Sequence, residues 1–213
     1  MILAAGRGQR LRPVTDTTPK ALVEIDGTNL LQRHLQRFAD ARINTIVINL
    51  GWLGERIAEG IGSGQQFGLQ IVYSPEYDNI LDTGGGIKRA LPILGHAPFW
   101  VINADIFTDM ALPNIKLDAN SLAHLVLVPT PAHKSAGDFE LRDGKIRNSE
   151  NQDLTYSGIA FYRPEMFENA DDGRFSVVPL LRAAADRGQL EGSLYEGEWQ
   201  DVGTPERLAA LNK

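Results

Sequence analysis

The sequence predicts an α/β fold, in which a doubly wound, mostly parallel sheet is followed by a C-terminal α+β elaboration. Strand-like and helix-like patterns alternate over residues 1–130. The strands of this half are continuously apolar, which is typical of strands that helices bury on both faces. Neither a repeat nor a linker interrupts the 213 residues. We therefore expect one domain with two halves, residues 1–130 and 131–213.

The elements of the first half follow from composition and spacing. An apolar strand, residues 1–5, opens the chain, and a short strand at 21–25 ends at an Asp-Gly turn pair. Apolar residues recur every three to four positions over 28–42, which predicts a helix with Thr28 or Asn29 as its N-cap. Further strands are predicted at 45–49, 69–73, 99–103 and 122–128, and further helices at 53–61 and 84–94.

The second half is less regular. Residues 129–138 are polar, contain two prolines and predict a mobile loop. An Arg-Asp-Gly turn after residue 141 predicts a hairpin, and residues 154–162 have strand character. Helices are predicted at 176–187 and after Thr204, where a cap, a proline and an acid follow one another.

Alternating strands and helices of this kind form a Rossmann-like sheet, whose ligands bind beyond the carboxyl ends of the strands. The loop that begins at Gly6, Asn49, the segment before Gly84, and Asp105 all fall just past predicted strand ends. The topology therefore gathers them at one edge of the sheet.

The composition is that of a soluble globular protein, with 43% hydrophobic and 23% charged residues. The chain has no cysteines, which excludes disulfides, thiolate nucleophiles and cysteine metal sites. It has no apolar run near the roughly 20 residues of a membrane helix and no secretory leader, so we expect a cytoplasmic protein. The net charge of −6 argues against nonspecific binding to nucleic acid, but not against a small anion in a locally basic pocket.

The loop after the first strand combines glycines with cations. Gly6 and Gly8 let backbone N–H groups approach a ligand, and Arg10, Arg12 and Lys20 oppose negative charge. A tight turn with solvated arginines is the plainer alternative. The position directly after a buried strand favours a cradle for a polyphosphate. The loop is neither a Walker A motif nor a dinucleotide fingerprint, because it lacks the Gly-Lys-Ser/Thr of the first and the third glycine of the second.

Two carboxylates and a glycine run complete the candidate site. Asp105 ends a buried strand and Asp201 precedes a helix, so each either caps a helix or binds a hard divalent cation such as Mg²⁺. Residues 82–86 read Asp-Thr-Gly-Gly-Gly at a helix start. Such a run is costly in backbone entropy, and close approach to a flat ring, such as a nucleobase, explains it better than mobility does. The four histidines are scattered without metal-ligand spacing.

Together these stretches resemble the sugar-phosphate nucleotidylyltransferase family over nearly the whole chain. The resemblance rests on residues 3–13, 19–22, 83–86, 103–105, 156–159 and 201–208, which follow in the order of the family. The nearest branch is that of the short bacterial N-acetylmuramate-1-phosphate uridylyltransferases of cell-wall recycling, to which residues 47–49, 52–54 and 137–139 point.

The family joins a nucleoside triphosphate to a sugar 1-phosphate and releases pyrophosphate. The resemblance implies the nucleotide-diphospho-sugar transferase type of fold, with a nucleotide-binding first half and a sugar-phosphate-binding second half. It implies UTP and a sugar 1-phosphate as small-molecule substrates and Mg²⁺ as the cofactor. It makes Arg10, Lys20 and Asp105 catalytic, and Asp105 and Asp201 the metal ligands. The implied nucleotide contacts are Leu3, Ala5, Gly6, Gly8, Arg10, Asn49, Asp82, Thr83, Gly84 and Gly85, and the implied sugar-side contacts are Asp138, Tyr156, Ser157 and Gly158.

The chain departs from the family pattern in three places. Asp82 stands where the branch usually has glutamate, and Ala104 where glycine or serine is common. The lysine with which many relatives grip the sugar phosphate has no clear counterpart between Arg147 and Tyr156. Transfer to glucose 1-phosphate, to mannose 1-phosphate from GTP, or to phosphocholine from CTP therefore stays open. A noncatalytic nucleotide-sugar sensor is disfavoured, because the two cations and two carboxylates are all present.

Overall fold

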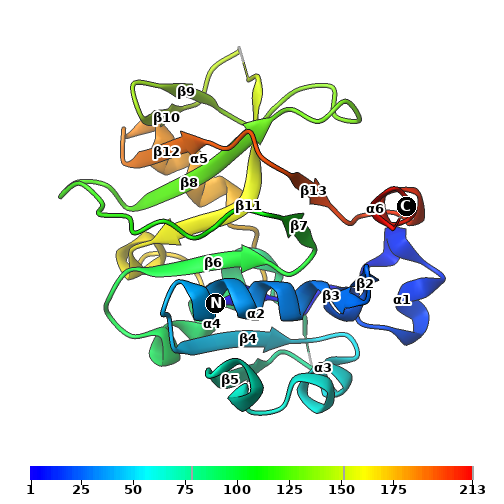
Figure 1. Cartoon of the computed structure of the whole chain (residues 1–213). Coiled ribbons are helices and arrows are strands. Elements are labelled where there is room, and N and C mark those ends of the chain that lie inside the picture. The colour runs from blue at the N-terminus through cyan, green and yellow to red at the C-terminus, as the bar shows by residue number, and fades with distance from the viewer. Residues whose placement is uncertain (78, 151, 213) are drawn as a thin grey trace.

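The computed structural model describes residues 1–77, 79–150 and 152–212. A nine-stranded sheet runs through the molecule in the order β5-β4-β1-β6-β11-β8-β12-β10-β9 (Figure 1). Its first four strands are parallel: β5 (Gln70–Pro75), β4 (Thr45–Leu50), β1 (Ile2–Leu3) and β6 (Phe99–Asn103). This half confirms the predicted doubly wound parallel sheet.

The sheet becomes mixed beyond β6. Strand β11 (Leu154–Tyr162) runs antiparallel to both β6 and β8 (Ala123–Pro129). Strand β12 (Leu190–Leu194) lies parallel to β8, and the hairpin of β9 (Glu140–Arg142) and β10 (Lys145–Arg147) ends the sheet. Strands of both halves of the chain thus share one sheet, as the predicted α+β elaboration requires.

Helices cover both faces of the sheet. Alternate residues of β4 and β6 enter two separate apolar clusters, because successive side chains of a strand point to opposite faces. Helices α2 (Leu30–Asp40) and α3 (Gly54–Ile61) pack on one face, and α4 (Asp82–Leu94) and α5 (Val178–Asp186) on the other. The Asn29 side chain accepts a hydrogen bond from the Gln32 amide at 2.8 Å, which confirms Asn29 as the cap of α2.

Two further pairs of strands lie outside the central sheet. The strand predicted at 21–25 is shorter than expected: η2 (Lys20–Leu22) precedes β2 (Glu24–Ile25), which pairs with β3 (Thr28–Asn29) around the Asp-Gly turn. Strand β7 (Ile106–Thr108), which we did not predict, pairs with β13 (Trp199–Asp201).

Short helices from both ends of the chain lie in or near the loop after β1. They are η1 (Gln9–Leu11), α1 (Val14–Thr17) and the C-terminal α6 (Pro205–Leu211), and α6 lies beside the α1 segment in Figure 1. Leu208 and Leu211 of α6 and Val14 of α1 pack against the same apolar cluster, which includes Leu11. The short helices η3 (Gln65–Phe67) and η4 (Pro164–Phe167) were not predicted. No helix in the described ranges is long and apolar enough to cross a membrane.

Candidate active site

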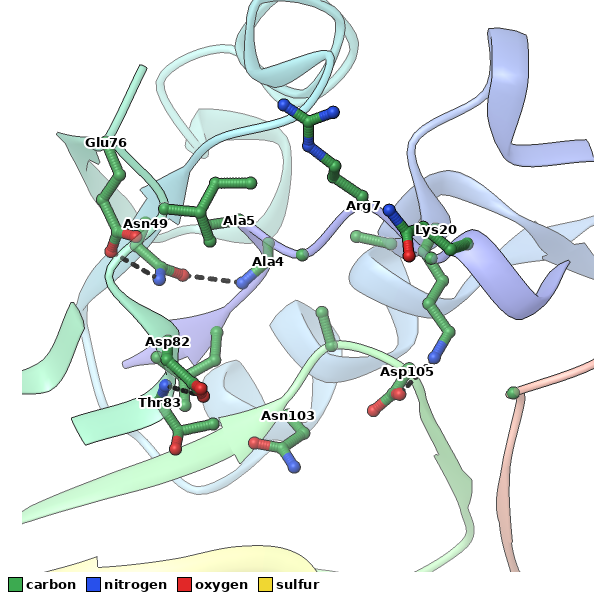
Figure 2. A pocket seen from close by; sticks show the side chains of 18 of the residues that line it. Ala4, Ala5, Arg7, Lys20, Asn49, Glu76, Asp82, Thr83, Asn103 and Asp105 are labelled. Atoms are coloured by element: carbon green, nitrogen blue, oxygen red, sulfur yellow. Dashed lines mark hydrogen bonds and ion pairs between the residues drawn. The ribbon is translucent and has the colours of Figure 1, made fainter. Parts of the chain in front are cut away.

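An open pocket of about 820 Å³ lies at the carboxyl ends of the parallel strands. Figure 2 shows the ends of the strands and the loops that surround it. Lys20 and Asp105 line the pocket, although they lie far apart in the sequence. So do eight of the predicted nucleotide contacts, namely Leu3, Ala5, Gly6, Gly8, Arg10, Asn49, Asp82 and Thr83. The rule that ligands bind past the strand ends therefore located the pocket correctly.

The loop after β1 needs glycine at position 8. Gly8 has a φ of +60°, and a Cβ there would lie 2.9 Å from Cγ2 of Thr15 and 3.3 Å from Cβ of Lys20. Its carbonyl accepts hydrogen bonds from the Leu11 amide at 2.9 Å and the Thr15 hydroxyl at 2.8 Å. The loop is thus folded tightly against Lys20, which brings Arg10 and Lys20 to the same pocket.

A chain of buried hydrogen bonds ties this loop to the opposite wall. The Ala4 amide donates to Oδ1 of Asn49 at 2.7 Å, and Nδ2 of Asn49 donates to Oε1 of Glu76 at 2.9 Å. Oε2 of Glu76 accepts from the Leu81 amide at 2.9 Å. Asn49 and Glu76 are 3% and 1% exposed, so each bond is made away from water. We did not predict a role for Glu76. The strand-end rule could have found it, because Glu76 directly follows β5 and Asn49 lies near the end of β4.

The glycines of α4 make their close contacts with the protein itself. A Cβ on Gly84 would overlap the ring of Phe175, and one on Gly85 would overlap the carbonyl oxygen of Gly173. The Gly84 and Gly85 amides both donate to the Phe175 carbonyl, at 3.0 and 3.1 Å. Packing against residues 173–175, which we did not predict, therefore explains two glycines of this run without a ligand. Gly84 and Gly85 do not line the pocket, and their contact with a base stays a prediction.

The segment that covers these glycines brings a cation that we did not predict. Arg174 lies between Gly173 and Phe175 and lines the pocket from the second half of the chain. The Phe175 amide bonds the Leu81 carbonyl at 3.1 Å, and the Val177 amide bonds Oγ1 of Thr83 at 2.9 Å. The sequence around Arg174 does not indicate a site residue, because Arg174 reaches the pocket only through the contact of its segment with residues 81–85.

Both predicted metal ligands are paired with cations. Asp105 forms an ion pair with Lys20, as Figure 2 shows, and Asp201 forms one with Arg207 of α6. Asp201 lies opposite Ile106 in the β13–β7 pair, and the Val202 amide donates to the Asp105 carbonyl at 2.8 Å. The chain thus brings the two acidic residues to the same end of one strand pair. Gly203, two residues after Asp201, lines the pocket.

This donor set fits Mg²⁺ better than a transition metal. Within the described residues, no cluster of three or more His, Cys, Asp or Glu side chains could hold a metal. Mg²⁺ is commonly held by one or two carboxylates together with substrate phosphates and water. Two carboxylates beside a pocket lined with arginine and lysine match that pattern.

The predicted sugar-side residues lie outside the lining of the pocket. Oδ2 of Asp138 accepts from the Tyr156 amide at 3.0 Å, and the Ser157 hydroxyl donates to the Val126 carbonyl at 2.7 Å. Burial raises the pKa of Tyr156 to about 12, and its hydroxyl lies 3.2 Å from that of Tyr162. The contact of these residues with sugar stays a prediction.

The structure explains why residue 158 is glycine. Its φ is +79°, and a Cβ there would lie 2.6 Å from Nδ2 of Asn103. Asn103 ends β6 and lines the pocket. Gly158 therefore leaves room for the Asn103 side chain, which lines the pocket.

Known proteins resemble this chain along its whole length. Residues 1–213 match the family described as "Nucleotidyl transferase". An N-acetylmuramate alpha-1-phosphate uridylyltransferase of Neisseria meningitidis is 45% identical over 217 residues, covering 98% of this chain and 94% of the relative. A protein of the same name from Caulobacter vibrioides is 36% identical, covering 99% and 94%.

Solved structures show the same fold. A putative glucose-1-phosphate thymidylyltransferase from Bacillus anthracis superposes with a TM-score of 0.87 at 22% identity, covering 99% of this chain and 92% of that one. A CTP:phosphocholine cytidylyltransferase from Streptococcus pneumoniae superposes with a TM-score of 0.78 at 19% identity, covering 99% and 96%. The predicted nucleotide-diphospho-sugar transferase type of fold is therefore confirmed.

Proposed function

The chain belongs to the nucleotidyl transferase family, and from that premise we propose that it joins UTP to N-acetylmuramate 1-phosphate, giving UDP-N-acetylmuramate and pyrophosphate. One observation carries the proposal: Arg10, Lys20 and Asp105 meet in a single pocket of a chain that is 45% identical to a relative of that name. We further propose that the reaction takes place in the cytoplasm and serves the recycling of cell-wall sugars.

The chemistry needs positioning and charge rather than a protein base. An oxygen of the sugar 1-phosphate attacks the α-phosphorus of UTP in line, a new P–O bond forms, and the bond to the β-phosphate breaks. The attacking oxygen is already anionic at neutral pH. Catalysis of phosphoryl and nucleotidyl transfer therefore depends on holding two polyanions together and stabilising the charge that develops on the leaving group.

The residues of the pocket divide this work. Arg10, Lys20 and the amides of the loop after β1 hold the triphosphate and stabilise the departing pyrophosphate. Asp105 and Asp201 would hold Mg²⁺, which when bound supplies Lewis-acid neutralisation of the phosphates. Arg174 would bind the acceptor phosphate, in place of the lysine that this chain lacks between Arg147 and Tyr156.

A substrate panel tests the proposal. Purified protein is given Mg²⁺, one of UTP, GTP, CTP or dTTP, and one of four acceptors: N-acetylmuramate 1-phosphate, glucose 1-phosphate, mannose 1-phosphate or phosphocholine. We expect pyrophosphate release to be fastest with UTP and N-acetylmuramate 1-phosphate, with a product of the mass of UDP-N-acetylmuramate. Faster release with another pair would reassign the substrates, and no release with any pair would refute the enzymatic function.

A further inference from the structure

Arg207 is a cation at the site that neither the charge pattern nor the resemblance had assigned. Nη1 of Arg207 pairs with Oδ2 of Asp201, and the two side chains are 18% and 21% exposed. Nε2 of His133 lies on the other side, 3.7 Å from Oδ1 of Asp201. The carboxylate that we assign to a metal is thus held by a cation of the protein.

The backbone of Arg207 and its side chain do different things. The Arg207 amide donates to the capping hydroxyl of Thr204 at 3.4 Å, and its carbonyl accepts from Nε2 of Gln200 at 3.3 Å. These backbone bonds hold the start of α6. The side chain instead reaches back to Asp201, so a change of the side chain alone leaves the backbone bonds in place.

Gly203 allows a second guanidinium to lie close to this pair. A Cβ on Gly203 would lie 2.9 Å from Oδ2 of Asp201, 3.0 Å from Nη1 of Arg207 and 3.4 Å from Nη2 of Arg10. Arg207 and Arg10 therefore flank the same residue, and that residue lines the nucleotide pocket. An Arg207 side chain that left Asp201 would already be beside the phosphate-binding cations.

Charge balance gives this arrangement a consequence. Lys20 is paired with Asp105, and Arg207 is paired with Asp201. A divalent cation at Oδ2 of Asp201 and the guanidinium that pairs with this oxygen repel each other at short range, so the two compete for the carboxylate. When the cation takes the carboxylates, the released side chains carry positive charge that a triphosphate can neutralise.

We propose that Arg207 is the exchangeable counter-ion of Asp201, which gives way to a divalent cation and then joins Arg10 in binding the pyrophosphate part of the nucleotide. This inference rests on the proposed function, since it assumes the metal role of Asp201. It gives the Arg207 side chain two effects of opposite sign. Its side chain weakens metal binding to the free protein and strengthens the binding of pyrophosphate.

The test measures the binding of Mn²⁺ alone to the full chain, from the electron paramagnetic resonance signal of the free ion. We expect Arg207→Gln to bind Mn²⁺ about fivefold more tightly than the unchanged protein, the scale of one partly exposed ion pair. Arg207→Lys, which keeps the charge, should lie between the two. Calorimetry should show pyrophosphate binding to Arg207→Gln with Mg²⁺ weakened about fivefold. Lys145→Gln is the control, because Lys145 pairs with Asp118 at 3.0 Å and does not line the pocket.

The outcomes separate this inference from the proposed function. If Arg207 serves only to hold α6, Arg207→Gln will bind Mn²⁺ no more tightly than the unchanged protein, and the inference is overturned. The same holds if Asp201→Asn leaves the Mn²⁺-tightening effect of Arg207→Gln intact. If Asp105→Asn and Asp201→Asn each bind Mn²⁺ like the unchanged protein, the metal assignment itself fails. Should Arg207→Gln not fold, a Mn²⁺ affinity of Arg207→Lys equal to that of the unchanged protein would overturn the inference.

Discussion

The buried pair of Asn49 and Glu76 can be tested by exchanging its amide and its carboxylate. We expect the double variant, Asn49→Asp with Glu76→Gln, to keep most of the stability of the protein, and each single variant to lose more of it. Asn49→Asp places an acceptor where an N–H donated, so that two oxygens face each other across the 2.9 Å now spanned by the hydrogen bond. Glu76→Gln turns an amide N–H group toward either Asn49 or the Leu81 amide, so that two donors face each other. In the double variant, the new amide at position 76 donates to the new carboxylate at position 49 and accepts from the Leu81 amide. That carboxylate still accepts from the Ala4 amide.

The magnitudes follow from the burial of the pair. Asn49 and Glu76 are almost completely buried, so each lost bond leaves polar groups without water. We expect Asn49→Asp to lower the free energy of unfolding by about 3 kcal/mol and Glu76→Gln by about 2 kcal/mol, the range for unpaired buried groups and for bonds to a charge. The double variant should lose about 1–2 kcal/mol, which is about 3–4 kcal/mol less than the two single losses together.

Urea unfolding followed by circular dichroism measures these differences, and calorimetry with UTP measures their effect on the pocket. UTP affinity should fall in both single variants and return in the double variant, because the pair joins the loop after β1 to the 76–81 segment. The double variant has the same net charge as the unchanged protein, so it controls for charge. A double variant as unstable as the worse single variant would refute the reasoning.

Four further predictions concern other parts of the molecule. Asp105→Asn and Asp201→Asn should each lower kcat/KM by about 100-fold or more, on the order of 3 kcal/mol of transition-state stabilisation; unchanged turnover at saturating Mg²⁺ would exclude the metal role. Gly84→Ala should destabilise the protein by about 1–3 kcal/mol in urea, because its Cβ overlaps Phe175, whereas Gly60→Ala, whose Cβ would meet Leu22 at 3.6 Å, should be neutral or stabilising. Arg174→Gln should raise the KM for the acceptor about tenfold and that for UTP much less, since it removes a charge-assisted contact to the acceptor phosphate; equal effects on both would contradict that role. Burial and the nearby Arg37 lower the pKa of His34 from 6.5 to about 3. Between these two pKa values, His34 is protonated in the unfolded chain but neutral in the folded protein. The free energy of unfolding should therefore fall by about 2–3 kcal/mol between pH 6.5 and pH 4.5. His34→Gln should remove most of that fall, and an unchanged slope would refute the assignment.

Local patterns in the sequence determined the parallel half of the fold and most of the pocket. Continuous apolar runs predicted β4, β5 and β6, because a strand buried on both faces must be apolar on both. The polar cap Asn29 predicted the start of α2, because a helix start needs an acceptor for its free amides. The strand-end rule then brought the Gly6 loop, Asn49 and Asp105 together. Each of these inferences depends either on residues that are close in the sequence or on the order of strands and helices, which such local patterns predict.

Tertiary structure alone decided what covers these elements and what pairs with the charged groups. Contact with Phe175 explains why residue 84 is glycine, Arg174 lines the pocket, and Arg207 pairs with Asp201. Nothing near these residues in the sequence indicates these contacts. Strand β12 was missed because Gly192 and Ser193 give it no apolar pattern, and its place beside β8 makes it a strand. The physical reason is the same in each case. A local pattern determines which face of a segment is apolar or charged, whereas the group that meets this face comes from a distant segment through packing of the whole chain.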